Sequence, residues 1–139
     1  MNNKFKALSE VNVRYSIADN TVTLAGSNKI TIPKRGLYIV TQLNLYLIYF
    51  TATPTYIETI AGFYTNGLYI DPGGDILSDI FYLPILGYAN VKTNGYCTRA
   101  SKVFLEENDY LEICGYIKTS GGTVTGRYIN YASLKVEEV

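Results

Sequence analysis

Short runs of alternating hydrophobic and polar residues, or runs rich in β-branched and aromatic residues, recur along all 139 residues. Gly, Pro, Asn and Asp separate these runs, which is the pattern of an all-β protein. The runs predict strands at Val11–Ile17, Thr21–Leu24, Lys29–Ile32, Leu37–Tyr49, Tyr56–Thr65, Leu68–Ile70, Asp79–Leu83, Tyr88–Val91, Tyr96–Leu105, Tyr110–Lys118, Thr123–Tyr131 and Ser133–Val136. Helix periodicity is nearly absent.

Tight turns and one weakly patterned segment divide this series of strands. Asn and Gly tolerate a positive φ, so short Asn- and Gly-bearing segments predict hairpin turns. These segments are Asp19-Asn20, Asn66-Gly67, Asn94-Gly95 and Ser120-Gly121-Gly122. No linker or repeat interrupts the chain, so we expect an N-terminal arm at residues 1–10 and a single domain at residues 11–139.

The two longest patterned strands carry apolar residues on both faces. In the strand 37–49 the odd positions form an aliphatic row, which we expect to face the core. The even positions include Tyr38, Val40 and Tyr46, a face too apolar to be left in water. In the strand 110–118, Leu111 and Ile113 predict the core face, and a Tyr-bearing face lies opposite.

The second faces are therefore expected to be covered, either by a partner subunit or by loops of this chain. We favour a partner subunit, because so short a chain has few elements to spare. The residues predicted to lie at such an interface are Tyr38, Val40, Tyr46, Tyr110, Cys114 and Tyr116. The chain has fourteen tyrosines. This number fits a subunit interface, but it also fits ordinary strands, because Tyr is common in both.

The amino-acid composition limits the binding partners and the catalytic groups that this chain can have. The chain has 12 basic and 12 acidic residues, so its charge gives no reason to expect binding to nucleic acid or to an anionic membrane. No apolar run reaches the ~18 residues of a membrane span, and Met1–Lys6 is polar, unlike a leader. The absence of His removes imidazole catalysis and imidazole metal ligation. We expect no enzyme activity and no cofactor.

The two cysteines are expected to be reduced. If Glu106–Asp109 closes a hairpin, Cys114 faces Ser101, four residues from Cys97. That separation is about 13 Å, whereas a disulfide needs Cα atoms within about 7 Å. Unbridged thiols are typical of proteins assembled in a reducing cytosol.

Two further groups of side chains suggest weaker candidate sites. Asp71, Asp75 and Asp79 surround a Gly-Gly loop and are a weak calcium candidate, since Ca²⁺ prefers several oxygen ligands. We favour a solvated turn, because the spacing lacks the density of an EF-hand. Tyr64 and Tyr69 could stack on a sugar, although strand tyrosines are the commoner explanation.

Three segments resemble one family. Pro33 through Gln42 resembles the P-x-x-G-x-Y entry to the long central strand of complement-C1q-like and tumour-necrosis-factor-like domains. Val103–Ile113 is similar to the family's L-x-x-G-D-x-V-x-L segment, with Asn108 in place of the glycine. Tyr131–Val136 resembles the closing strand. The resemblance implies an antiparallel, ten-stranded jelly-roll sandwich that forms a homotrimer.

Similar trimeric domains decorate bacteriophage particles or cap bacterial spore-surface filaments. We therefore expect a non-enzymatic virion protein, a capsid decoration or head-fibre component, that binds viral capsid or fibre proteins after assembly in the bacterial cytoplasm. One alternative is a receptor-binding tip that recognises host-surface carbohydrate. Another is a trimerisation domain of a bacterial cell or spore surface.

Overall fold

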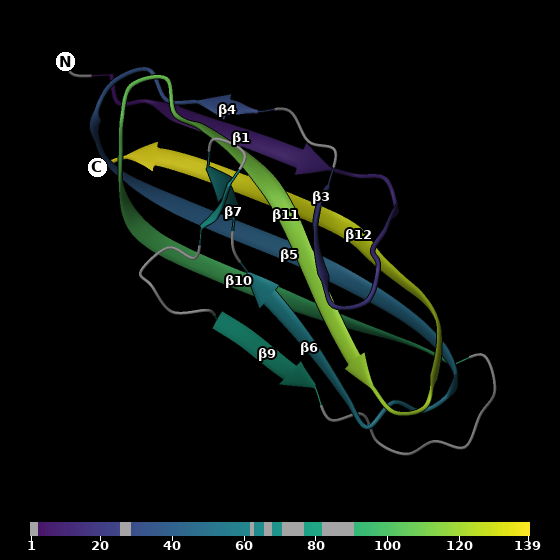
Figure 1. Ribbon diagram of the computed structural model, residues 1–139. Coiled ribbons are helices and arrows are strands. Elements are labelled where there is room, and N and C mark those ends of the chain that lie inside the picture. The colour runs from purple at the N-terminus through teal and green to yellow at the C-terminus, as the bar shows by residue number, and fades with distance from the viewer. Residues whose placement is uncertain (1–2, 26–28, 62, 66–67, 71–76, 82–90) are drawn as a thin grey trace.

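The computed structural model describes residues 3–25, 29–61, 63–65, 68–70, 77–81 and 91–139, with side chains except at 56, 60–99 and 101. The described residues form strands and no helix. All strand pairs are antiparallel. The strands build two sheets that lie against one another (Figure 1).

Sheet one has five strands in the order β1-β12-β5-β10, and β2 also pairs with β12. Its strands are β1 (Lys6–Val11), β2 (Tyr15–Ser16), β5 (Gly36–Ala52), β10 (Val91–Leu105) and β12 (Thr123–Glu138). The two central strands, β5 and β12, are also the longest. The three longest strands of the described residues, β5, β10 and β12, thus all lie in sheet one.

Sheet two has seven strands in the order β8-β7-β11-β6-β9, and β3 and β4 also pair with β11. Its strands are β3 (Thr21–Leu24), β4 (Ile30–Thr31), β6 (Tyr56–Ala61), β7 (Phe63–Thr65), β8 (Leu68–Ile70), β9 (Leu77–Phe81) and β11 (Tyr110–Ser120). Along the sequence the chain crosses repeatedly between the sheets. β5, β10 and β12 lie in sheet one, whereas the segments between them supply sheet two. This is an antiparallel jelly-roll sandwich, as the family resemblance implies, although the described residues form twelve strands and not ten.

The core fills the space between the sheets. The aliphatic side chains of Leu111, Ile113 and Ile117 from sheet two are fully buried, as the pattern of the strand 110–118 predicts. Burying an aliphatic side chain of this size contributes about 1.5–3 kcal/mol to folding. A Cβ at Gly115, on the same face, would collide with Ile129 of sheet one. Gly115 therefore lets the two sheets approach closely.

The predicted turns at Asp19-Asn20 and Ser120-Gly121-Gly122 are confirmed, whereas Asn66-Gly67 lies outside the described residues. Asn20 and Asn108 adopt φ of 58° and 70°, and Gly121 and Gly122 adopt 71° and 63°. The Asn94-Gly95 turn is a wrong prediction. These residues lie inside β10, where the register pairs them with Leu47 and Tyr46 of β5. Long-range pairing overrides the local turn preference here, and β10 runs without a break from Val91 to Leu105. Residues 88–90 of the predicted strand Tyr88–Val91 lie outside the described residues.

The N-terminal part of the chain also differs from expectation. The weakly patterned arm was predicted to extend to residue 10, but Lys6–Val11 forms β1 at the edge of sheet one. Its pairing with β12 supplies the backbone hydrogen bonds that the local pattern did not reveal. Both ends of the chain lie at the same end of the sandwich, which we call the terminal end (Figure 1).

Candidate functional site

Most of the predicted interface residues lie in the chain's own core. Tyr38, Val40 and Tyr46 of β5, together with Cys114 of β11, are all buried. The assignment of the two faces of β5 is therefore wrong: the even positions face sheet two, and the odd positions face outward. The cover over the tyrosine-bearing face is the chain's own second sheet, neither the partner subunit that the sequence favoured nor the loops that were its alternative.

Amide side chains explain why this polar face can be buried. Gln42 Nε2 donates to the Cys114 carbonyl (2.9 Å), and Asn44 Nδ2 donates to the same oxygen (2.7 Å). Asn44 Nδ2 also lies 2.9 Å from the Tyr46 hydroxyl. Buried polar groups are tolerated when they are hydrogen-bonded, so the amides become a link between the sheets. The sequence showed these amides, but not their partner 70 residues away.

The thiol of Cys114 is not a reactive group in this environment. Burial raises its pKa to about 12, and a hydrogen bond with Gln42 offsets part of this effect. The hairpin on which the disulfide estimate rested is a wrong prediction, because β10 and β11 lie in different sheets. The side chain of Cys97 lies outside the described residues, so the expectation of two reduced thiols stays a prediction.

The other two predicted interface residues, Tyr110 and Tyr116, lie partly exposed on β11. The Lys29 ammonium lies 4.2 Å from the centre of the Tyr110 ring. The Tyr116 hydroxyl donates to Asn20 Oδ1 at 2.7 Å. Both rings thus have contacts within the chain, and their role at a subunit interface stays a prediction.

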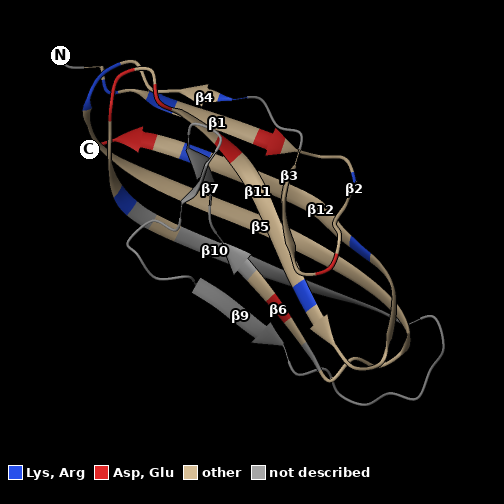
Figure 2. Ribbon diagram, in the orientation of Figure 1, with Lys and Arg blue, Asp and Glu red and all other residues tan. Residues whose placement is uncertain are grey.

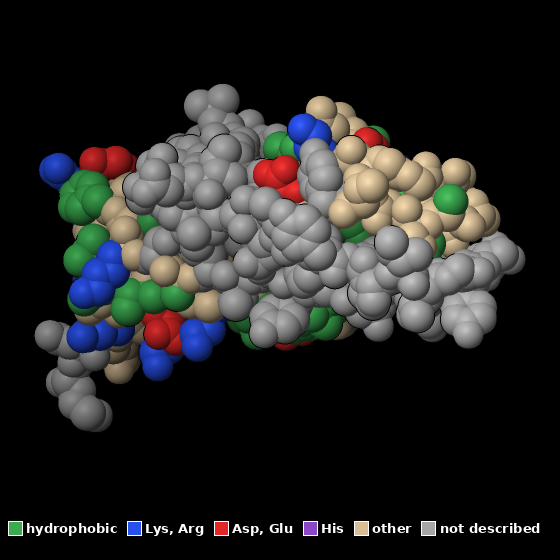
Figure 3. Space-filling model, turned by 90° about the horizontal axis from the view of Figure 1, so that it is seen from below, with side chains coloured by type: hydrophobic (Ala, Val, Ile, Leu, Met, Phe, Trp, Pro, Cys, Tyr) green, Lys and Arg blue, Asp and Glu red, His purple; other side chains and the backbone are tan. Residues whose placement is uncertain are grey.

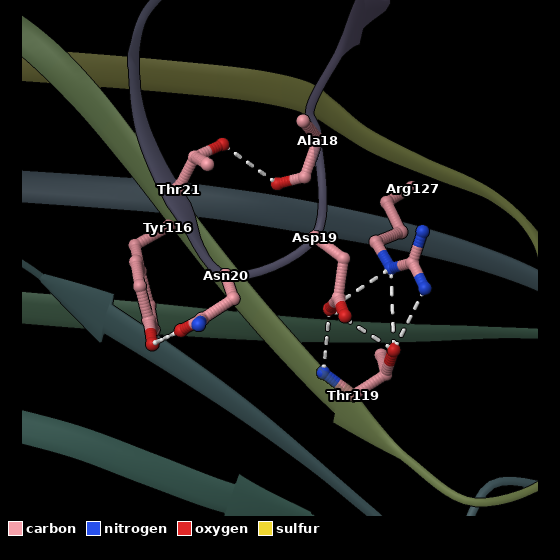
Figure 4. A network of polar contacts seen from close by, with 7 residues as sticks. All are labelled: Ala18, Asp19, Asn20, Thr21, Tyr116, Thr119 and Arg127. Carbon is pink, nitrogen blue, oxygen red and sulfur yellow. Dashed lines mark hydrogen bonds and ion pairs between the residues drawn. The ribbon is translucent and has the colours of Figure 1, made fainter.

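A polar network holds the β2–β3 turn against β11 (Figure 4). Asp19 Oδ1 accepts hydrogen bonds from the backbone N–H of Thr119 (2.8 Å) and from its hydroxyl (3.1 Å), and lies 3.3 Å from Arg127 Nε. Arg127 also donates to the Thr119 hydroxyl at 2.8 Å. Since the carboxylate and the guanidinium satisfy one another, this network is structural rather than a binding site.

The outward face of sheet one carries the aliphatic row of β5. Leu37 and Leu45 are 41% and 36% exposed, and Ile39 and Leu43 between them are partly buried. Neighbouring strands extend the row: Phe104 of β10 pairs with Leu37 and is 54% exposed. We call Leu8, Leu37, Ile39, Leu43, Leu45 and Phe104 the assembly face. A water-exposed sheet face is normally polar, so this surface is the strongest candidate for a partner contact.

Charged residues accompany the assembly face on β1 and β12. Lys135 and Glu137 form an ion pair at 2.9 Å, and the register places Lys6 opposite Glu137. Charged residues of both signs are concentrated at the terminal end of the molecule (Figure 2). Such flanking charges contribute more to the choice of partner and orientation than to affinity.

An ion pair joins three segments at the terminal end. The Glu138 carboxylate lies 2.7 Å from the Lys34 ammonium and accepts a hydrogen bond from the backbone N–H of Phe5 at 3.0 Å. The Tyr38 hydroxyl donates to the Lys34 carbonyl at 2.6 Å, and the Phe5 ring packs edge-on against Tyr38. The tyrosine of the P-x-x-G-x-Y segment therefore anchors the turn before β5.

The weaker candidate sites lie largely outside the described residues. Asp71 and Asp75 are not described, and Asp79 is described only by its backbone in β9. Tyr64 and Tyr69 are likewise described by backbone alone, and β7 and β8 pair them with one another. Among the described residues, no group of acidic, His or Cys side chains could hold a metal ion.

Comparison with known proteins finds a likeness among solved structures. No protein-family model matches the chain, and no curated protein matches it. The chain is similar to the solved structure of Eiger TNF from S. frugiperda, with 13% identity and a TM-score of 0.45, over 98% of this chain and 92% of that chain. The jelly-roll assignment depends on this chain's own strand order. Among the described residues, no helix is long and apolar enough to cross a membrane.

Proposed function

We propose that this protein is a non-enzymatic structural module that forms a homotrimer through the assembly face of sheet one. The observation that carries the proposal is the row of Leu37, Ile39, Leu43 and Leu45, which alternates outward on β5. Each of these side chains would gain burial in a complex, and apolar burial is the main driving force for association.

The two outward faces of the sandwich support this choice of surface. The outward positions of β11 in sheet two include Glu112, Tyr116 and Lys118, and the register places Glu58 opposite Lys118. The part of this face whose side chains are described can remain in water. The assembly face of sheet one is aliphatic by contrast. Hydrophobic side chains, interspersed with charged ones, are visible at the terminal end of the molecule (Figure 3).

The biological setting that we propose is a bacteriophage particle, with the trimer as a capsid decoration or head-fibre component. The three-fold assembly and the particle setting depend on the resemblance of the Pro33–Gln42, Val103–Ile113 and Tyr131–Val136 segments. The partners would then be viral capsid or fibre proteins, and the site of assembly the bacterial cytoplasm. Neither catalysis nor a cofactor is part of this proposal.

The mass of the protein in solution tests the self-association. Light scattering coupled to size exclusion should give about three times the 15.5 kDa of one chain. Leu45→Asp places a charge on the assembly face and should shift the mass toward that of one chain. Leu24→Asp is a matched control, because Leu24 is also 36% exposed but lies on β3 of sheet two.

A monomeric wild-type protein would overturn the self-association. A trimer that survives Leu45→Asp and Leu37→Asp would show that another surface makes the contact. The particle setting is tested separately, by mass spectrometry of particles purified from the source of the gene. Particles that lack the chain, while the purified protein is trimeric, would remove the virion role and leave the assembly module.

A further inference from the structure

Further along the outward face of sheet one, an arginine lies against two tyrosine rings. The Arg14 guanidinium carbon lies 5.7 Å from the centre of the Tyr49 ring and 5.3 Å from that of the Tyr128 ring. The two rings meet edge to face, with centres 6.0 Å apart and planes at 82°. Arg14 lies between β1 and β2, whereas the rings come from the neighbouring strands β5 and β12.

Glycine at position 126 is what lets the Tyr128 ring lie close to the sheet. A Cβ at Gly126 would be only 2.6 Å from Tyr128 Cε2 and 2.8 Å from its hydroxyl oxygen. The ring therefore packs over a backbone position that no larger residue could occupy without moving it. Tyr49 pairs with Gly126 in the register, so both rings and the glycine form one continuous platform.

Unused hydrogen-bonding capacity distinguishes this cluster from the other described arginines. Arg35 pairs with Glu106 at 3.3 Å, and Arg127 pairs with Asp19. Within the described part of the chain, Arg14 has no carboxylate partner, and neither ring hydroxyl of the platform has a protein hydrogen-bond partner. A positioned guanidinium offers several N–H donors in one plane, which suits a carboxylate.

We propose that Arg14, Tyr49 and Tyr128 form a binding site for an acidic saccharide unit. The carboxylate of the sugar would accept hydrogen bonds from the Arg14 guanidinium. Its hydroxyl groups would bond to the two phenol groups, and its C–H surface would pack on the exposed parts of the rings. A simple carboxylate would use only the first of these contacts, so the rings favour a sugar acid as the occupant.

The site shares no residue with the assembly face, although Tyr49 lies further along the same outward row of β5. Leu45 pairs with Tyr131, whereas Tyr128 pairs with Leu47, further along β5 toward the end opposite the termini. The saccharide site can therefore be removed without changing a residue of the assembly face. Its failure would leave the trimer untouched, and a monomeric protein could still bind the sugar.

Titration of the ¹⁵N-labelled full chain with sodium glucuronate tests the proposal, with glucose and sodium acetate as matched probes. Glucuronate should shift the backbone signals of Arg14, Tyr49 and Tyr128 in a saturable way. Glucose lacks the carboxylate and acetate lacks the ring, so both should bind at least about tenfold more weakly.

Three variants locate the binding. Arg14→Gln should weaken glucuronate binding about tenfold or more, because the charge-assisted hydrogen bonds are lost. Tyr49→Phe combined with Tyr128→Phe retains the rings and should also weaken it. Arg35→Gln removes an arginine that lies over Phe104 instead, at 5.0 Å from the ring centre, and should change nothing.

The spectra of the variants without ligand show whether each has kept its fold. If acetate binds as tightly as glucuronate, the proposal of a saccharide site is wrong, and the cluster is a site for simple anions only. Glucuronate binding that is unchanged in Arg14→Gln, or absent from the wild-type protein, would overturn the site.

Discussion

The two faces of β5 show that side-chain chemistry alone does not decide which residues are buried. The inward face carries Gln42 and Asn44, and both are buried. The outward face carries Leu37 and Leu45, and both are exposed to water. The amides can be buried because the Cys114 carbonyl accepts hydrogen bonds from both. Within the described residues, nothing covers Leu37 and Leu45 in the way that sheet two covers the amides.

The contrast between the two faces of β5 distinguishes residues that stabilise one folded chain from residues that stabilise an association of chains. Inward residues hold one chain together, so changing them should alter the free energy of unfolding. Outward residues should leave the unfolding of one chain almost unchanged and alter association instead. Neighbouring positions on the same strand can therefore be compared directly.

The largest expected effect comes from Tyr46→Ala. Truncating a buried aromatic ring removes packing and leaves a cavity, so the free energy of unfolding should fall by about 3–5 kcal/mol. Tyr46→Phe retains the ring and should cost only about 1 kcal/mol, because one hydroxyl is lost. The adjacent Leu45→Ala, measured on dissociated chains, should change unfolding by less than about 0.5 kcal/mol.

Urea denaturation of the three variants gives these values. Equal losses for Tyr46→Ala and Leu45→Ala would contradict the assignment of the two faces.

Loss of one amide should have an intermediate effect. Asn44→Ala removes a donor from the Cys114 carbonyl and another from the Tyr46 hydroxyl, at an expected cost of about 1–3 kcal/mol. Thr41→Ala, on the outward face, serves as the control and should cost less than about 0.5 kcal/mol. In a double-mutant cycle, Asn44→Ala and Gln42→Ala should be coupled, because they share one acceptor. Additive effects would show that the amides act independently.

The sequence predicts the parts of this fold that depend on local patterns. β3 and β8 have the predicted bounds, and the positive φ of Asn108 follows from its place before Asp109 in the turn. The core face of β11 is also correct, because Glu112 and Lys118 mark the opposite face unambiguously.

The sequence could not orient β5, because both of its faces contain apolar residues. The deciding partner of Gln42 and Asn44 is a carbonyl 70 or more residues away, which no local pattern reveals. The Arg14 cluster was missed for the same reason. Its two tyrosines meet only through the pairing of β5 with β12. One exposed and two partly exposed residues far apart in sequence give no periodic signal.

The smallest expected effect concerns Glu138, which the register places opposite Tyr38 at the terminal end of β5. Contact with Lys34, followed by the hydrogen bond from the Phe5 N–H, lowers the pKa of the Glu138 carboxyl below its ordinary value of 4.5. The resulting stabilisation is present above pH 4.5 and is lost as the pH falls through the lowered pKa. The same contact raises the pKa of Lys34 above 10.5, so it is also lost in strong alkali.

Glu138→Gln should therefore lower the free energy of unfolding at pH 7, whereas the difference from the wild-type protein should shrink toward pH 3. Glu107→Gln is the matched control, since Glu107 is exposed in the turn between β10 and β11. Urea denaturation of the three proteins at pH 7, 5 and 3 measures the effect. A difference that stays constant over this range would mean that Glu138 acts through packing and not through its charge. The contacts of Glu138 at the terminal end of β5 would then be independent of charge, like the neutral hydrogen bonds of Gln42 and Asn44 that link the two sheets.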